Sequence, residues 1–256
     1  MGRMKSELFV LKRMILRFCI AFGVVFGGLF FLTLKPVTVL GGVFLFPVFG
    51  SPSLVTQLFL SAKSFLVPAD IPLVALGPVS SFTAPIMTAL LLTILLVFPY
   101  GLYLFGTFLR PALYQAERGA LSRILLPALV LFYLGCTLAY TIIIPQTFRI
   151  LYSFSAPIGV TPLFALDTFI STVFLLTLAV GLTFLLPIVM AILTRFRLVP
   201  QGFWLRHWRG AVLATVIFSA VVTPDGSGVT MVFLSIPLLV LYGLGAVMYL
   251  SFESSV

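Results

Sequence analysis

Charged side chains are scarce in this chain of 256 residues. Asp, Glu, Lys and Arg together make up only 8% of it, whereas 61% is hydrophobic and the mean hydropathy is +1.26. Soluble domains carry about 25% charged residues. The 15 basic and 6 acidic side chains present here cannot form the polar surface that a soluble fold of this length needs. This scarcity excludes an ordinary soluble protein and indicates that lipid solvates most of the surface.

Groups for catalysis or metal binding are almost as rare. The chain has one histidine, His207, and two cysteines, Cys19 and Cys136, which lie in separate apolar runs. It contains no HExxH, GxSxG or GxxxxGK[ST] pattern. An intramembrane enzyme would need a nucleophile with its base, or a metal site, and neither can be assembled from these residues. We therefore expect no enzyme activity, no metal, no cofactor and no disulfide.

Long hydrophobic runs are what the chain has in abundance. Runs long enough to cross a bilayer lie near residues 14–34, 82–109, 124–145, 168–194 and 229–250. A sixth run, AVLATVIFSAVV at 211–222, would span only about 18 Å as a helix. The turn signal Thr-Pro-Asp-Gly at 223–226 follows it, which favours a pair of antiparallel helices. We predict an all-α integral membrane protein with six transmembrane helices, short fifth and sixth helices, and one domain over residues 1–256.

Basic residues gather on one side of this predicted topology. With the N-terminus inside, all of the 15 except Lys35, Lys63 and Arg149 fall at cytoplasmic ends. Because orientation follows the Lys and Arg bias in loops, we expect both termini in the cytoplasm and location in the cell membrane. The same rule accounts for the net charge of +9 without a nucleic-acid partner. Trp204 and Trp208 in the last cytoplasmic loop are typical of interfacial anchors.

The first outer connection, residues 35–81, is apolar but punctuated by Gly and Pro. Neither of its two segments, VTVLGGVFLFPVFG and LVTQLFLSAKSFLVP, has the pattern of a spanning helix. We expect two interfacial segments rather than re-entrant loops, because buried irregular backbone needs polar partners that are scarce here.

One cytoplasmic connection carries chemistry of interest. The segment RPALYQAER, residues 110–118, contains Glu117, the only carboxylate among three neighbouring arginines. Glu117 either pairs locally, which contributes little at an exposed site, or receives an external guanidinium, which a carboxylate binds bidentately. The residues alone leave both interpretations open.

Several stretches, in order, are similar to one family. They are SSFTAPIM (80–87), RPALYQAER (110–118), LFYLGCTLAYTIIIP (131–145), GLTFLLP (181–187) and SAVVTPDGSGVTMVFLSIPLLVLY (219–242). Together they resemble TatC, the multispanning subunit of the twin-arginine protein translocase. The resemblance covers roughly residues 80–245 and agrees with six spans.

The resemblance implies a receptor subunit that binds twin-arginine signal peptides and helps to export folded proteins with the proton-motive force. It implies single-span TatA/TatB-type partners in an oligomeric complex within the lipid membrane. It places Glu117 at the first of two family acidic positions, with Tyr114 and Arg118 beside it. The second position lies in the N-terminal segment ELFVLKRMI, where Val10 stands at the family glutamate. Glu7 could take that role one helical turn earlier, or be a solvated charge.

Other positions also depart from the family pattern. In the fourth span, Leu185 replaces a membrane-embedded Glu or Gln, so a partner contact around Phe184, Leu185 and Pro187 must be apolar, replaced elsewhere or absent. Gly243 stands where the family often has Glu, and Ser80 where it is often acidic. A family member that has lost transport remains an alternative. So does a six-span secondary transporter or permease subunit, which a polar cluster at the membrane midplane would favour.

Overall fold

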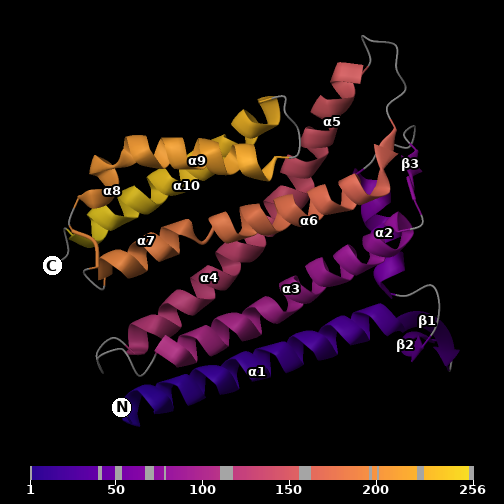
Figure 1. The fold of residues 1–256 in the computed structure, drawn as a ribbon, viewed down its shortest axis with the longest axis horizontal. Helices are drawn as coiled ribbons and strands as arrows, with labels where there is room; N and C mark the ends of the chain where they lie inside the picture. The colour runs from indigo at the N-terminus through magenta and orange to yellow at the C-terminus, as the bar shows by residue number, and fades with distance from the viewer. Residues whose placement is uncertain are drawn as a thin grey trace. The chain divides into compact units, whose positions relative to one another are not determined.

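The computed structural model describes residues 2–39, 42–49, 54–66, 72–77, 79–109, 118–155, 163–195, 198–200, 202–223 and 228–253 (Figure 1). Side chains are described for fewer residues, and for most of the two longest strands the backbone alone is described. Within these ranges, five helical segments are long and apolar enough to cross a membrane: Leu11–Phe31, Ser80–Phe108, Ile124–Leu151, Leu166–Thr194 and Thr230–Val247. The five long spans predicted from the sequence are confirmed as helices.

The chain divides into two compact units, each with its own packing. Unit 1 comprises residues 1–125 with 163–170, and unit 2 comprises residues 126–162 with 171–256. The elements that begin in unit 1 are α1 (Gly2–Phe31), β1 (Leu32–Val39), β2 (Gly42–Phe49), α2 (Leu54–Leu66), β3 (Leu73–Val74), α3 (Ser80–Leu109), α4 (Arg118–Leu138), β4 (Phe164–Ala165) and α6 (Leu166–Thr183).

The connection after the first span contains a β-hairpin that the sequence analysis did not predict. Strands β1 and β2 pair antiparallel from Leu32 opposite Phe49 to Val39 opposite Gly42. Only two residues separate the strands, which is hairpin spacing. Pro36 lies within β1, which is tolerated because each strand of a two-stranded sheet has a free edge.

The rest of this connection contributes packing within unit 1. Helix α2 has 13 residues, too few to cross a bilayer, as expected. Its Phe59 ring packs edge-on to Phe169 near the start of α6, with centroids 6.4 Å apart. Strand β3 pairs in parallel with β4, so the segment leading to α3 lies beside the segment leading to α6.

Unit 2 holds the remaining helices. They are the π-helix η2 (Ala139–Ile143), α5 (Ile144–Ser155), α7 (Leu186–Arg195), α8 (Phe203–Arg206), α9 (Trp208–Val222) and α10 (Val229–Glu253), together with most of α4 and α6. Phe132 of α4, Leu176 of α6 and Leu238 of α10 are fully buried, so each of these helices contributes apolar side chains to the interior of the unit.

The third span is longer than predicted. It continues past Pro145 to Leu151, because the chain widens into a π turn rather than ending its helix. Proline cannot donate a hydrogen bond to the carbonyl four residues earlier and its ring crowds that carbonyl. In η2 the Ile144 N–H bonds to the Ala139 carbonyl, five residues back, and this wider turn brings Pro145 into the helix.

The last two helices differ in length. Helix α9 has 15 residues, in agreement with the predicted short fifth helix. Helix α10 has 25 residues, so the prediction of a short sixth helix was wrong. Pro237 lies inside α10 without ending it, and apolar residues continue to Leu250, which extends the helix beyond its 18-residue apolar window.

Candidate functional site

Helices α1 and α3 of unit 1 lie side by side and run in opposite directions (Figure 1). They pack closely at Gly101 of α3, where a Cβ atom would lie only 2.9 Å from Cε2 of Phe18. Glycine at this position lets the aromatic ring reach the backbone of α3. The pairing therefore fixes which ends of the two helices lie together.

The N-terminal end of α1 lies beside the C-terminal end of α3. Glu7 precedes Phe18 by 11 residues, about 16 Å along the α1 axis, and α3 continues for 8 residues, about 12 Å, from Gly101 to Leu109. Because the helices are antiparallel, both stretches extend toward the same end. A Cβ atom at Gly106 would be 2.9 Å from Cδ1 of Leu125, so the beginning of α4 packs against the last turn of α3 there.

Two of the four predicted signal-peptide residues, Glu7 and Arg118, lie on the elements that meet at this end of unit 1. Tyr114 and Glu117 fall outside the described residues, in the segment between α3 and α4. Glu7 lies in α1, and Arg118 is the first residue of α4, with only the backbone described for both. The helices therefore bring the backbone of Glu7 and the start of α4 to one end of the unit.

Helices α4 and α6 cross closely in unit 2 at two glycines. A Cβ atom at Gly181 would be 2.4 Å from Sγ of Cys136 and 3.1 Å from the Phe132 ring. A Cβ atom at Gly135 would be 2.7 Å from Cγ of Phe184. Gly181 of α6 thus faces side chains of α4, and Gly135 of α4 faces Phe184, which lies between α6 and α7. Small residues at such positions let helices approach closely in a lipid environment.

The fourth span is broken where the partner-contact residues were predicted. Helix α6 ends at Thr183 and α7 begins at Leu186. Pro187 has no N–H to bond to the Thr183 carbonyl, and at the break the Leu185 N–H bonds to the Leu182 carbonyl, three residues back. Phe184 and Pro187 are buried within unit 2, whereas Leu185 is half-buried.

An apolar stripe follows one side of the broken span. Leu175, Leu182 and Val189 are 44%, 55% and 45% exposed and repeat every seven residues. Leu178 and Leu185, both half-buried, lie between them, so the five residues are spaced alternately three and four apart. This spacing is the seam that one helix presents to another in a coiled coil. We call these five residues the α6–α7 seam.

Helices α7 and α10 pack through another small residue. A Cβ atom at Gly245 would be 2.9 Å from Sδ of Met190 and 3.2 Å from the backbone Cα of Pro187. Gly243, two residues earlier, is exposed, and a Cβ atom there would meet nothing within 4 Å. The two glycines of α10 therefore have different surroundings, one closely packed and one open.

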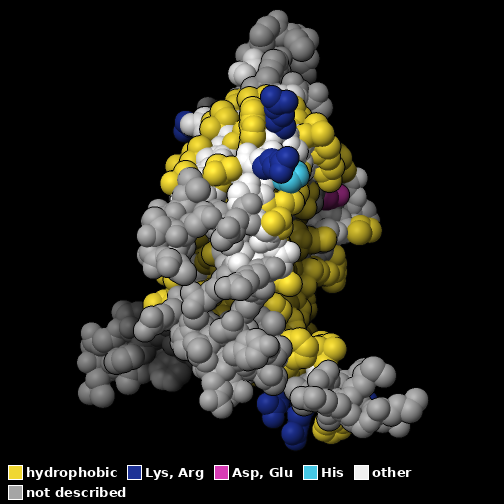
Figure 2. Space-filling view, turned by 90° about the vertical axis from the view of Figure 1, so that its left-hand side faces the viewer, with side chains coloured by type: hydrophobic (Ala, Val, Ile, Leu, Met, Phe, Trp, Pro, Cys, Tyr) yellow, Lys and Arg dark blue, Asp and Glu magenta, His cyan; other side chains and the backbone are white. Residues whose placement is uncertain are grey.

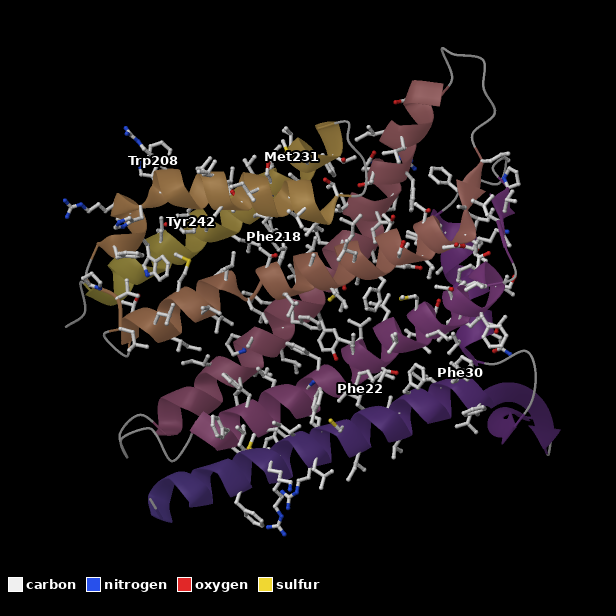
Figure 3. The ribbon with its side chains drawn as sticks, viewed as in Figure 1. Phe22, Phe30, Trp208, Phe218, Met231 and Tyr242 are labelled. Carbon is white, nitrogen blue, oxygen red and sulfur yellow. The ribbon has the colours of Figure 1, made fainter. Side chains whose placement is uncertain are left out.

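Hydrogen bonds fix the segment between α7 and α9. Trp204 of α8 donates from Nε1 to Oγ1 of Thr194 in α7 at 3.0 Å, and the Tyr242 hydroxyl of α10 donates to the Trp204 carbonyl at 2.6 Å. Trp208, at the start of α9, is 54% exposed on the outer side of the helix (Figure 3). The predicted interfacial tryptophans therefore differ, since one is tied to its neighbours and the other is open.

The sequence model of one protein family, described as "Sec-independent protein translocase protein (TatC)", matches residues 7–237. The chain belongs to the TatC family. The Sec-independent protein translocase protein TatC of Cenarchaeum symbiosum is 34% identical over 237 residues, which are 92% of this chain and 89% of that protein. TatC of Aquifex aeolicus is 30% identical over 174 residues, covering 68% of this chain and 72% of its own.

Solved TatC structures agree with this membership. A crystal structure of the twin-arginine translocase receptor TatC is 25% identical and superposes with a TM-score of 0.76 over 95% of this chain and 97% of that one. A second, obtained in the detergent DDM, gives 0.77 over 94% and 98%. The resemblance inferred from the five sequence stretches is therefore confirmed, and the chain is a multi-pass membrane protein of a protein translocase.

The structure shows the surroundings of two residues that depart from the TatC pattern, Ser80 and Gly243. Ser80 is buried at the start of α3, where its hydroxyl donates to the Gly77 carbonyl and accepts from the Gly77 N–H at 3.2 Å. It thus satisfies backbone groups before α3, a role for which serine is well suited. Gly243 has open space in place of the family side chain.

Two sets of residues near the predicted partner-contact site were not predicted from the sequence: the α6–α7 seam and three glycines at helix contacts. The seam members other than Leu185 were not singled out, although their seven-residue spacing was visible in the sequence. The close helix contacts at Gly135, Gly181 and Gly245 were not predicted either. A glycine in an apolar run does not reveal which side chain lies opposite it.

Proposed function

We propose that this TatC-family chain is the translocase's receptor for twin-arginine signal peptides of folded precursor proteins. The observation that supports it is the antiparallel α1–α3 pair, which brings the α1 end bearing Glu7 to the end of unit 1 where α4 starts. Glu117 directly precedes α4 in the sequence. Two carboxylates contributed from this end would match a pair of guanidinium groups.

The chemistry of recognition follows from the shapes of the groups. A guanidinium presents a planar fork of donors that a carboxylate oxygen pair accepts bidentately, whereas a lysine ammonium offers only a point charge. Specificity for two arginines over two lysines thus requires carboxylates held in place. In the proposal Glu117 and Glu7 accept the two guanidinium groups, and Tyr114 and Arg118 flank Glu117 in the same surface.

The wider topology is part of the same proposal. The whole chain acts as one transmembrane domain with α9 as the additional short span, which gives six spans and places both termini in the cytoplasm of a cell membrane. Export of folded proteins would draw on the proton-motive force through the assembled complex, because the sequence carries no nucleotide-binding loop.

Partner subunits are proposed to dock on the α6–α7 seam. A single-span TatA/TatB-type helix would pack its own apolar residues against Leu182, Leu185 and Val189. The contact would be apolar, since Leu185 offers no hydrogen bond. Phe184 and Pro187 would hold the seam in place from the interior of unit 2, because both are buried and Pro187 causes the break. The resulting complex would be oligomeric.

The six-span transporter alternative is not favoured by the buried hydroxyl groups. Such a transporter would gather polar groups near the membrane midplane. Instead, Thr88, Thr93 and Thr183 each donate a hydrogen bond to the carbonyl four residues earlier in the same helix, at 2.8, 2.7 and 2.6 Å. These three hydroxyls satisfy their own helices, whereas the buried hydroxyls of Thr177 and Ser219 have no hydrogen-bond partner among the described residues.

Photo-crosslinking in native membranes tests the receptor proposal. A photoreactive residue beside Glu117 should crosslink to a twin-arginine signal peptide and not to its twin-lysine variant. Glu117→Gln should abolish the crosslink. Glu253→Gln, which removes a carboxylate at the end of α10, is the matched control and should leave it unchanged. No crosslink to either peptide with a folded, inserted protein would refute the proposal.

Glu7 has its own test in the same assay. Glu7→Gln should weaken the crosslink about tenfold or more if the carboxylate accepts a guanidinium, since a charged hydrogen bond contributes about 1.5–3 kcal/mol. Val10→Glu, which places a carboxylate at the family position one turn later, should restore binding to the Glu7→Gln variant. An unchanged crosslink in Glu7→Gln would make this residue a solvated charge.

A further inference from the structure

The turn that joins α8 to α9 carries two parallel rows of exposed side chains. Leu205 and Trp208 form an apolar row, 44% and 54% exposed, and Arg206 and Arg209 form a cationic row beside it. Both rows have a spacing of three residues, so each pair shares a helical face. We call these four residues, with His207 between them, the basic-aromatic patch.

The backbone keeps both rows in register although α8 ends at Arg206. The N–H groups of Arg206, His207 and Ala211 bond to carbonyls four residues earlier at 3.0, 3.0 and 3.1 Å. Through Trp204, the segment is also tied to Thr194 of α7 and Tyr242 of α10. The basic-aromatic patch is therefore held by three helices, and little conformational freedom remains to be lost on binding.

The positive charge of the patch lacks nearby acidic residues in the sequence. No Asp or Glu occurs between Asp167 and Asp225. The Arg209 guanidinium lies 5.7 Å from the Trp208 ring centroid, a cation–π geometry that keeps the guanidinium beside the apolar row. Figure 2 shows Lys and Arg side chains directly beside the single histidine, on a surface with many hydrophobic side chains.

His207 has one ring nitrogen committed to the backbone. Its Nδ1 lies 2.9 Å from the Phe203 carbonyl oxygen, which can only accept, so Nδ1 carries a proton. Its ring also stacks on Phe203, with centroids 4.1 Å apart. Nε2 is thereby directed away from the backbone and can hydrogen-bond a ligand at the patch. The exposed imidazole adds a polar group between the two arginines.

We propose that the basic-aromatic patch binds the phosphate headgroup of an anionic phospholipid. Arg206 and Arg209 would hold the phosphate oxygens, and Leu205 and Trp208 would lie along the glycerol and upper acyl chain. A soluble phosphate would use only the cationic row, whereas a lipid uses both, and the adjacent apolar row therefore favours the lipid. This binding does not depend on the proposed receptor function.

Tryptophan fluorescence tests the proposal, because Trp204 and Trp208 are the two tryptophans of the chain. Trp204→Phe leaves Trp208 as the only reporter. The protein would be reconstituted in phosphatidylcholine nanodiscs containing 10 mol % of a brominated lipid, either phosphatidylglycerol or phosphatidylcholine. One basic residue near a membrane surface enriches anionic lipid about fivefold. Two would give about 25-fold without screening, so we expect at least about tenfold enrichment beside Arg206 and Arg209. The anionic quencher should then occupy roughly half of the sites beside Trp208 instead of one tenth.

Charge variants provide the controls. Arg206→Gln with Arg209→Gln should remove the preference for the anionic quencher, whereas Lys63→Gln with Arg149→Gln, which removes two charges elsewhere, should retain it. Should Trp204→Phe destabilise the segment, the same comparison in the chain with both tryptophans still reports largely on exposed Trp208. Equal quenching by the two brominated lipids would overturn the proposal. So would loss of the preference on adding inorganic phosphate but not sodium chloride of equal ionic strength, because it would reveal a general anion site.

Discussion

The crossing of α4 and α6 permits a sharp test of the packing. A methyl group placed at Gly181 would lie 2.4 Å from Sγ of Cys136, well inside van der Waals contact. The sulfur cannot simply rotate away at no cost, because it contacts the Thr177 carbonyl at 3.7 Å in a buried position. The fully buried Phe132 ring stands 3.1 Å from the same methyl. Gly181→Ala must therefore displace α4 or α6.

The expected cost can be estimated from similar substitutions. Overpacking a close-packed interior destabilises a protein by about 1–3 kcal/mol. The higher helix propensity of alanine offsets up to about 1 kcal/mol of this. We expect Gly181→Ala to lower the free energy of unfolding by about 1–2 kcal/mol. Gly243→Ala is the matched control in the same unit, since its methyl meets nothing within 4 Å, and it should be neutral or slightly stabilising.

A double-mutant cycle isolates the contact. Cys136→Ala alone removes a buried sulfur and should cost about 1 kcal/mol. Combined with Gly181→Ala it frees the space that the new methyl needs, so the double variant should be at least about 1 kcal/mol more stable than the sum of the single effects predicts. Reversible unfolding in mixed detergent micelles, followed by tryptophan fluorescence, measures all four proteins. Strict additivity, or a Gly181→Ala variant as stable as Gly243→Ala, would refute this account of the crossing.

Three further substitutions probe other contacts. Gly245→Ala should destabilise the α7–α10 pair by about 1–3 kcal/mol in the same unfolding assay, because the Pro187 backbone cannot move aside as a side chain can; a neutral result would exclude that close approach. Thr194→Val should lower the free energy of unfolding by about 1 kcal/mol, because it leaves the Trp204 Nε1–H without its acceptor. The melting temperature should fall accordingly, and an unchanged melting temperature would show that this hydrogen bond contributes nothing. Gly106→Val should force the end of α3 away from α4 and reduce signal-peptide crosslinking beside Glu117 several-fold, whereas a full crosslink would show that this packing does not position the site.

The spans could be predicted because lipid makes a simple demand on sequence. An apolar run of sufficient length must satisfy its own backbone as a helix, and five such runs did so. Local breaks were harder to predict from the same information. Pro145 and Pro187 look alike in the sequence, yet the chain passes the first through a π turn and breaks at the second. Hydrophobic periodicity does not distinguish these two outcomes.

The candidate site shows a similar division. Glu117 was predicted from its charge and its match to the family pattern, and Glu7 from its charge one helical turn before the family position, because carboxylates are rare in this composition. That α1 and α3 pack through Phe18 and Gly101 was not predictable, because glycine is common throughout the apolar runs and a contact needs both partners. The hairpin β1–β2 was missed for another reason: apolar residues interrupted by proline and glycine suit an interfacial segment as well as a small sheet.

The π turn at Ala139–Ile143 also bears on how this chain can be compared with its relatives. A π turn contains one residue more than an α turn, so it behaves as an insertion that the helix has absorbed without unfolding. Every residue after it is rotated by about 100° relative to a continuous α-helix, because each residue advances an α-helix by that angle. A relative that lacks the extra residue would present a different face of α5 at equivalent positions. An alignment of this span with such a relative would need a gap inside the helix.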